Sequence, residues 1–114
     1  MSFRTPLLAL LLLPVVAACA AAGGQAAVAT DHVDLPRSYR FAPASITVAP
    51  GTTVTWTNSD NFTHSVTFAD DAAPGQVLAP GETVERTFDR VGTFTYVCTF
   101  HSQDMRGTVT VATP

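Results

Sequence analysis

The sequence has no lysine, only two cysteines and few charged residues, which make up 13% of its 114 residues. Its six basic residues are all arginines, and they are scattered, so the chain has no basic stripe of the kind that binds nucleic acid. Two cysteines are too few for a scaffold stapled by disulfides. Hydrophobic residues make up 46%, which excludes a disordered chain, and the length suits a single domain.

No apolar run is long enough to span a bilayer, because the longest, near the N-terminus, has sixteen residues against the ~20 that are needed. Arg4 precedes this run and small residues follow it, which is typical of a secretory signal peptide. Residues 1–18 are predicted to be a leader of the lipoprotein type, because Val16-Ala17-Ala18-Cys19 resembles a bacterial lipobox, in which the cysteine is lipidated. The alternative is an ordinary leader that is cleaved after Ala22. Either leader predicts export to the periplasm or the outer face of the membrane, with a lipid anchor if Cys19 is modified.

Residues 19–30 contain mainly Ala, Gly, Gln, Val and Thr without any charge, which predicts a flexible tether. The folded domain is therefore expected over 31–114. A lipidated Cys19 cannot form a disulfide, so Cys98 would be an unpaired thiol in an oxidising compartment. An unpaired thiol in that setting needs a chemical explanation.

Short segments of alternating apolar and polar residues fill the chain from Ser45 onward. Val, Thr and aromatic residues, which favour strands, occupy the clearest of these segments: 46–48, 54–57, 65–68, 94–97 and 108–111. The tripeptide Ala-Pro-Gly, whose Pro and Gly suit the centre of a type II turn, occurs three times: at 49–51, 73–75 and 79–81. Regularly spaced short strands with such turns predict an all-β sandwich or barrel.

Side-chain parity points four residues able to bind a metal toward one end of this structure. Cys98 continues the aromatic, core-facing side of one predicted strand, and His64 begins the core-facing side of another. If these strands are neighbours, the two side chains meet. A tight loop then returns His101 toward Cys98, and Met105 follows just before the last predicted strand.

Two imidazoles, one thiolate and a weak thioether form the ligand set of a type 1, or blue, copper site. Thiolate suits Cu(I), imidazole suits both oxidation states, and Met is a weak axial ligand that tunes the reduction potential. Taken singly, His64 has an ordinary explanation as a hydrogen-bonded loop histidine, Cys98 as a buried thiol and Met105 as core filler. Zinc also accepts Cys and His, but the Met favours copper.

From Phe41 to Val111 the sequence resembles the small blue copper proteins, the cupredoxin family of plastocyanin, pseudoazurin and amicyanin. The matching blocks are Phe41-Ala42-Pro43 with Ile46-Thr47-Val48, Pro50 to Asn58, His64-Ser65-Val66, and Gly92 to Val109. The resemblance implies a Greek-key β-sandwich of about seven to eight strands. It also implies one copper ion, cycling between Cu(I) and Cu(II), whose ligands are His64, Cys98, His101 and Met105.

The loop between His101 and Met105 departs from the family's pattern. Three residues separate them here, against two in amicyanin-like proteins and four in plastocyanin and pseudoazurin. The axial ligand is therefore either Met105 or Gln103, whose amide oxygen can fill the same place. Residues around the ligands usually orient them. The resemblance implies that Ser65, after the first His, bonds across to Thr99 in the Cys loop, and Asn58 is expected to brace the loop that leads to His64.

These features predict an exported, monomeric one-electron carrier that is not an enzyme. His101, with apolar Phe100, Pro43 and Pro74 nearby, is the expected docking edge for a transient redox partner. Loss of Arg4 with the leader leaves nine acidic residues and five arginines, a net charge of −4. That charge favours a basic partner, such as a cytochrome or a membrane oxidoreductase.

Two other functions are weighed against electron transfer. A periplasmic copper-storage or delivery protein would need a labile, Met-rich site, and the chain has two Met, one of which is Met1. A copper nitrite reductase or oxidase would need a second, His-rich copper centre. Of the three histidines, only His32 is left unassigned, in an entry segment that is expected to be exposed.

Overall fold

The computed structural model describes residues 2, 26–70, 75–102 and 104–114. The predicted leader, the lipidation site Cys19, Pro74 and the alternative ligand Gln103 lie outside the described residues. Within them the chain forms nine strands and no helix, so the described part has no helix that could cross a membrane. The strands are β1 Val28–Ala29, β2 His32–Leu35, β3 Ser45–Val48, β4 Thr52–Asn58, β5 His64–Phe68, β6 Gln76–Leu78, β7 Thr83–Phe88, β8 Gly92–Val97 and β9 Arg106–Val111.

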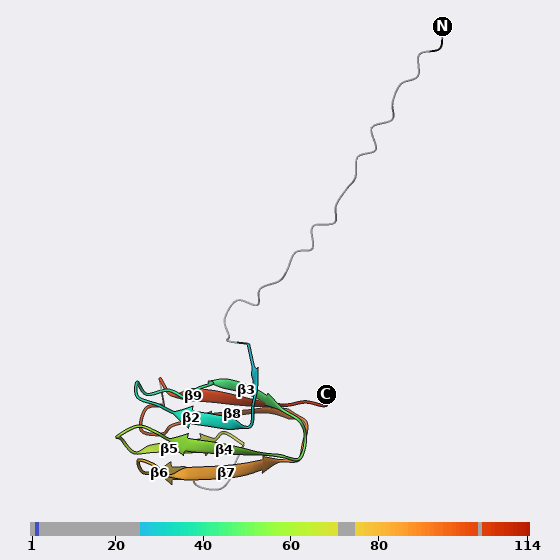
Figure 1. Cartoon of the computed structure of the whole chain (residues 1–114). Coiled ribbons are helices and arrows are strands. Elements are labelled where there is room, and N and C mark those ends of the chain that lie inside the picture. The colour runs from blue at the N-terminus through green and yellow to red at the C-terminus, as the bar shows by residue number, and fades with distance from the viewer. Residues whose placement is uncertain (1, 3–25, 71–74, 103) are drawn as a thin grey trace.

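The strands form two sheets that pack face to face (Figure 1). The six-stranded sheet has the order β1-β3-β9-β8-β5-β6, and the three-stranded sheet has the order β2-β4-β7. β3 lies parallel to β1 and β9, whereas β8 lies antiparallel to both β5 and β9. Strands far apart in the sequence are thus neighbours in the sheet, as in a Greek key. The predicted all-β sandwich is confirmed.

Alternation along the strands places apolar side chains between the sheets. Trp56 of β4 is fully buried, and its ring packs edge-to-face on Phe68 and Tyr96 of the facing sheet at centroid distances of 5.6 and 5.4 Å. Burying each large side chain stabilises the fold by about 1.5–3 kcal/mol. The buried hydrophobic residues are Val33, Leu35, Phe41, Ile46, Val48, Val54, Trp56, Val66, Phe68, Leu78, Phe88, Tyr96, Cys98, Met105, Val109 and Val111.

The sheet begins before the domain boundary that was expected at Asp31. Val28 and Ala29 of β1 already pair in parallel with β3, inside the segment predicted to be a tether. Two residues are too short to show an alternating pattern, so composition alone gave no sign of this strand. β2 then continues along β4, and its Val33 and Leu35 enter the core.

The two Ala-Pro-Gly segments that the structure describes in full form the predicted turns. Gly51 and Gly81 have φ values of 88° and 84°, which L-residues other than Gly rarely adopt. In each turn the residue after Gly donates a backbone hydrogen bond to the Ala carbonyl, at 3.2 and 3.0 Å. Both are therefore turns of type II geometry. The third segment, 73–75, lies partly outside the described residues.

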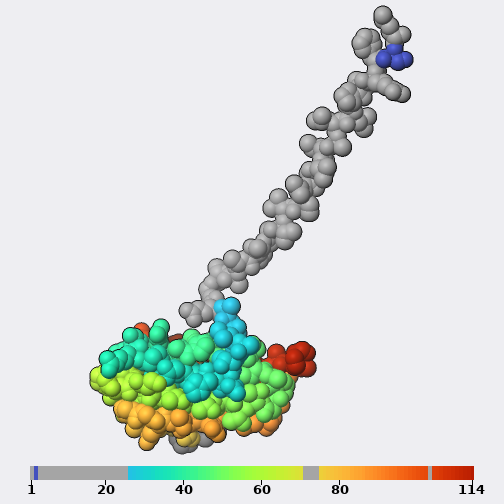
Figure 2. Space-filling model, in the orientation of Figure 1, coloured from blue at the N-terminus to red at the C-terminus, as the bar shows by residue number. Residues whose placement is uncertain are grey.

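Four connections gather at one end of the sandwich, at the left of Figure 1: those between β2 and β3, β4 and β5, β6 and β7, and β8 and β9. The C-terminal residues, red in Figure 2, project from the opposite end. The residues expected to bind a metal belong to the loop-bearing end.

Candidate metal centre

The pairing of β5 with β8 brings His64 and Cys98 together. The two strands are antiparallel, with Phe68 opposite Tyr96, so the start of β5 lies beside the residue that follows β8. Both side chains are fully buried, and Cys98 Sγ lies 3.8 Å from His64 Nδ1. The neighbouring strands predicted from side-chain parity are therefore present.

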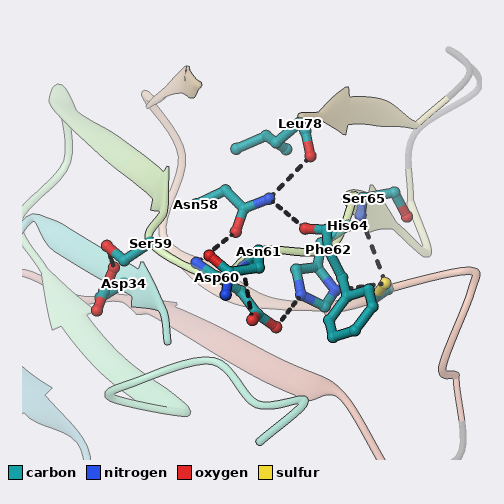
Figure 3. A network of polar contacts seen from close by, with 10 residues as sticks. Asp34, Asn58, Ser59, Asp60, Asn61, Phe62, His64, Ser65 and Leu78 are labelled. Atoms are coloured by element: carbon teal, nitrogen blue, oxygen red, sulfur yellow. Dashed lines mark hydrogen bonds and ion pairs between the residues drawn. The ribbon is translucent and has the colours of Figure 1, made fainter. Parts of the chain in front are cut away.

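Asp60 determines which nitrogen of His64 faces the cysteine. Its Oδ2 lies 2.9 Å from His64 Nε2, and the carboxylate is 5% exposed (Figure 3). A carboxylate accepts hydrogen bonds, so Nε2 carries the proton and donates a hydrogen bond to Asp60. The lone pair is then on Nδ1, which points toward Cys98 Sγ. This hydrogen bond is the main reason that the pKa of the Asp60 carboxyl lies below its usual value.

Asn58 fixes the loop that carries Asp60. Its Nδ2 donates to the carbonyls of Phe62 and Leu78 at 2.8 and 2.9 Å, and its Oδ1 accepts from the Asp60 backbone N–H at 2.9 Å (Figure 3). The side chain is fully buried, so each bond is protected from water. The expected bracing of the loop by Asn58 is thus seen as contacts, and it reaches His64 through Asp60.

Ser65 and Thr99 link the two strands next to the buried pair. Ser65 N–H lies 3.4 Å from Cys98 Sγ and donates to it. Ser65 Oγ accepts from the Thr99 backbone N–H at 2.8 Å and lies 2.9 Å from Thr99 Oγ1. The Ser65 N–H thus orients the sulfur, as groups around a metal-binding residue commonly do.

His101 and Met105 come from one tight loop that is closed by backbone hydrogen bonds. His101 N–H donates to the Cys98 carbonyl at 3.1 Å, and the His101 carbonyl accepts from Met105 N–H at 2.9 Å. Cys98 N–H in turn donates to the Met105 carbonyl at 3.1 Å. Met105 is fully buried, whereas His101 is partly exposed. The loop therefore presents one imidazole near the surface and one thioether in the interior.

Two aromatic residues beside His101 were not anticipated from the sequence. The Tyr39 ring lies 4.4 Å from the His101 ring, and Phe62 stacks on Tyr39 at 6.0 Å. Tyr39 is 41% exposed and Phe62 is 57% exposed, so both stand at the surface. Phe100, which was expected there, is also exposed. The surface around His101 is thus aromatic.

The geometry of the buried pair suits a soft metal ion. Two donors of one ion, with bonds of about 2.3 Å to sulfur and about 2.0 Å to nitrogen, lie roughly 3.5–4 Å apart. The Sγ–Nδ1 separation of 3.8 Å falls in that range. The His64 and His101 ring centroids are 5.6 Å apart. Among the described residues, no group of three His, Cys, Asp or Glu side chains is already gathered as a metal site.

Comparison with known proteins identifies a family that binds copper. The model of the family described as "Copper binding proteins, plastocyanin/azurin family" matches residues 26–112. Plastocyanin of Scenedesmus fuscus is 37% identical over 83 residues, which cover 62% of this chain and 85% of that protein.

Two solved structures share the fold. A purple cupredoxin from Nitrosopumilus maritimus superposes with a TM-score of 0.66 and 27% identity, over 73% of this chain and 100% of its own. A reduced amicyanin mutant superposes with a TM-score of 0.66 and 32% identity, over 71% of this chain and 80% of its own. The chain therefore belongs to the plastocyanin/azurin family of copper-binding proteins, and its cofactor is one type 1 copper ion.

Proposed function

We propose that this protein is an exported one-electron carrier whose copper is bound by His64, Cys98, His101 and Met105. The observation that carries the proposal is the buried pair of Cys98 Sγ and His64 Nδ1, 3.8 Å apart, with Asp60 on the opposite nitrogen. Both donors are oriented toward one point by strands and hydrogen bonds. Copper, when bound there, takes up and gives up one electron between Cu(I) and Cu(II).

The chain's own residues keep the two oxidation states alike in geometry. Pairing of His64 with Leu78 of β6 and the hydrogen bond between Thr99 and Ser65 fix the backbone beside the two donors, and Asp60 fixes the imidazole ring. A donor that is held in place cannot rearrange much when the charge of the metal changes. A small rearrangement gives a low barrier to electron transfer. His101, partly exposed at the end of the sandwich, is the ligand through which we expect electrons to pass.

The other functions considered find less support. The proposed site contains one Met, and the chain's other Met is Met1, so a Met-rich delivery site is absent from the sequence. His32, the histidine left for a second copper centre, is an exposed residue at the start of β2. Two of the three histidines belong to the proposed site, so the sequence supports one copper site. We therefore assign it no enzymatic activity of its own.

Export and membrane attachment also belong to the proposal. The leader-like residues 1–18 support export, and Val16-Ala17-Ala18-Cys19 supports lipidation at Cys19. Mass spectrometry of the mature protein tests both points. A lipid-modified N-terminal Cys19 is expected, and Cys19→Ala is expected to release the protein from the membrane. An N-terminus further along the chain without lipid would instead show an ordinary leader.

The decisive experiment is a visible absorption spectrum of the protein with one equivalent of Cu(II), before and after ascorbate. An intense blue band that bleaches with ascorbate and returns on reoxidation is the expected result, because it reports thiolate-to-copper charge transfer. Cys98→Ala should abolish the band. A colourless copper complex, or a Cys98→Ala variant that stays blue, would contradict the proposed ligand set.

A further inference from the structure

A basic groove lies beside the proposed copper site. It has a volume of about 440 Å³ and runs where the β2–β3 connection meets the start of β9. Arg40 and Arg106, both exposed, line it together with the 41–45 segment, Gly107 and Thr108. Phe41 at its base packs on the core residue Tyr96 with ring centroids 4.7 Å apart. The floor of the groove is therefore rigid, and its two cations are free to meet a ligand.

Neither arginine of the groove is neutralised within the described part of the chain. Arg86, by contrast, forms a two-pronged ion pair with Asp70 at 3.1 and 3.2 Å. No such carboxylate contact is formed by Arg40 or Arg106 among the described residues. Asp104, although close in sequence, lines a separate depression with Phe100 and His101. The groove thus carries two positive charges that have no carboxylate partner among residues 26–70, 75–102 and 104–114.

Each arginine directly follows, in the sequence, a residue of the proposed copper site or one in contact with it. Arg106 directly follows Met105, whose carbonyl accepts from Cys98 N–H. Arg40 directly follows Tyr39, whose ring lies 4.4 Å from that of His101. The groove therefore borders the two segments that contact His101. A partner that docks against His101 would have these arginines at the edge of its contact surface.

We propose that this groove docks a carboxylate-bearing face of the redox partner, an inference that rests on the proposed function. Guanidinium groups bind carboxylates through two parallel hydrogen bonds, and two such groups orient a partner as well as attract it. The net charge of −4 for the exported chain favours a basic partner. Local charge decides the docking orientation, because salt screens interactions beyond about 10 Å at 0.1 M ionic strength.

Small redox reagents of opposite charge test the docking charge without a known partner. The reduced copper protein gives one electron to hexacyanoferrate(III), which becomes hexacyanoferrate(II) while Cu(I) becomes Cu(II). Tris(phenanthroline)cobalt(III), a cation, accepts one electron in the same way. Because the exported chain has a net charge of −4, the salt dependence is read as a difference between the parent and a variant that lacks the groove charges. Rising ionic strength should slow the hexacyanoferrate reaction of the parent relative to that of this variant, and an identical salt dependence of the two proteins would overturn the proposal.

Paired variants assign this effect to the groove. Arg40→Gln with Arg106→Gln should slow the hexacyanoferrate reaction severalfold at low ionic strength and leave the cobalt reaction equal or faster. Arg90→Gln removes the same kind of charge from the exposed β7–β8 turn and should change neither rate much. Replacing both groove arginines by Lys should retain most of the salt dependence. Equal effects of the groove and Arg90 variants would overturn the proposal.

A competitor then identifies the chemistry of the partner. Polyglutamate should inhibit the hexacyanoferrate reaction of the parent protein but not that of the double Gln variant. Inorganic phosphate at matched ionic strength is the control and should inhibit much less. Equal inhibition by phosphate, or groove-dependent binding to anionic lipid vesicles without inhibition by polyglutamate, would overturn a carboxylate-bearing protein partner. The blue band must be present in every variant, so a failed copper site is distinguishable from a failed docking site.

Discussion

Asp60 places a buried negative charge against the outer nitrogen of His64, and this predicts a tuned reduction potential. The carboxylate stabilises the more positive Cu(II) state more than it stabilises Cu(I). Asp60→Asn should therefore raise the reduction potential. A tenfold change in relative affinity corresponds to about 59 mV for a one-electron couple, so a rise of tens of millivolts is expected. Protein-film voltammetry of the copper protein measures it.

Asp104→Asn is the matched control for this prediction. It removes the same charge from an exposed position in the ligand loop, where no hydrogen bond to a ligand side chain is described. Its potential should change much less than that of Asp60→Asn. Nitrogen-15 NMR of the metal-free protein adds an independent readout, because Asp60 should hold the proton on His64 Nε2. Equal shifts in the two variants would show that the Asp60 contact has no special effect.

The axial ligand is predicted to be Met105, whose side chain is fully buried behind the Cys98 loop. An amide oxygen is a harder donor than a thioether and favours Cu(II). Met105→Gln should therefore keep copper bound but lower the reduction potential, which voltammetry and the visible spectrum would record. An unchanged potential would move the axial role to Gln103 or remove it altogether.

At the scale of single residues, the sequence predicted the proposed metal ligands better than the residues that orient them. The four proposed ligands were visible because their donor atoms and their spacing are themselves chemical signals. Asp60 was missed, although a carboxylate four residues before His64 is a signal that could have been used. Tyr39 had no such signal. It reaches His101 through a loop in which Ser38 and Tyr39 have φ values of 88° and 51°, and alternation along strands does not report such turns.

At the scale of elements, β8 and β9 pack so closely that the Tyr96 ring occupies the space over Gly107, its partner in the ladder. A Cβ at Gly107 would overlap that ring, so the sequence must keep Gly here. Among the described residues the Tyr96 hydroxyl has no well-formed hydrogen bond, and the nearby Trp56 Nε1–H offers it only a weak one. Burying this hydroxyl therefore has a cost to stability.

Tyr96 predicts a loss of stability in alkali. Burial raises the pKa of Tyr96 to about 12, whereas an unfolded chain ionises it near 10. Between these values the unfolded state loses its proton and the folded state keeps it, so stability falls as the pH rises. The loss approaches about 2–3 kcal/mol by pH 12.

Tyr96→Phe should remove this alkaline loss and leave stability at pH 7 little changed, because the hydroxyl that disappears has at most a weak hydrogen bond to Trp56. Urea unfolding of the metal-free protein from pH 7 to 11.5 measures both effects. Tyr39→Phe is the control, since that ring is 41% exposed. A variant of Tyr96 with the same alkaline loss as the parent would contradict the argument.

Element by element, the sequence predicted the strands that alternate clearly and missed the short ones. β4, β5, β8 and β9 combine a buried face with Thr or Ser on the other face, so period-2 alternation exposed them. β1 and β6 have two and three residues, too few for a period to show. β1 depends on pairing with β3, and β6 on pairing with β5. Such edge strands are set by tertiary contacts that local patterns do not encode.

At the scale of the whole molecule, the metal site depends on the sandwich more than the sandwich depends on the metal site. Strand pairing and the aromatic core position the backbones that carry His64 and Cys98. Loop hydrogen bonds position Met105 in the same way. The His101 ring contacts Tyr39 and His64 but is partly exposed, so the fold encloses it less than it encloses the buried His64, Cys98 and Met105. We therefore expect copper to bind first to the buried His64 and Cys98 and to bring the loop that carries His101 into place.

This asymmetry predicts that the metal-free protein stays folded but melts at a lower temperature. Copper that binds only the folded state at a thousandfold excess over its Kd adds about 4 kcal/mol. For a domain of this size the melting temperature should rise by more than about 10 °C. Circular dichroism should show the same β-sheet signal at 25 °C with and without copper, and calorimetry should show the shift. In Cys98→Ser the shift should shrink strongly. A metal-free chain that is unfolded at 25 °C would mean that copper, rather than strand pairing, organises the site.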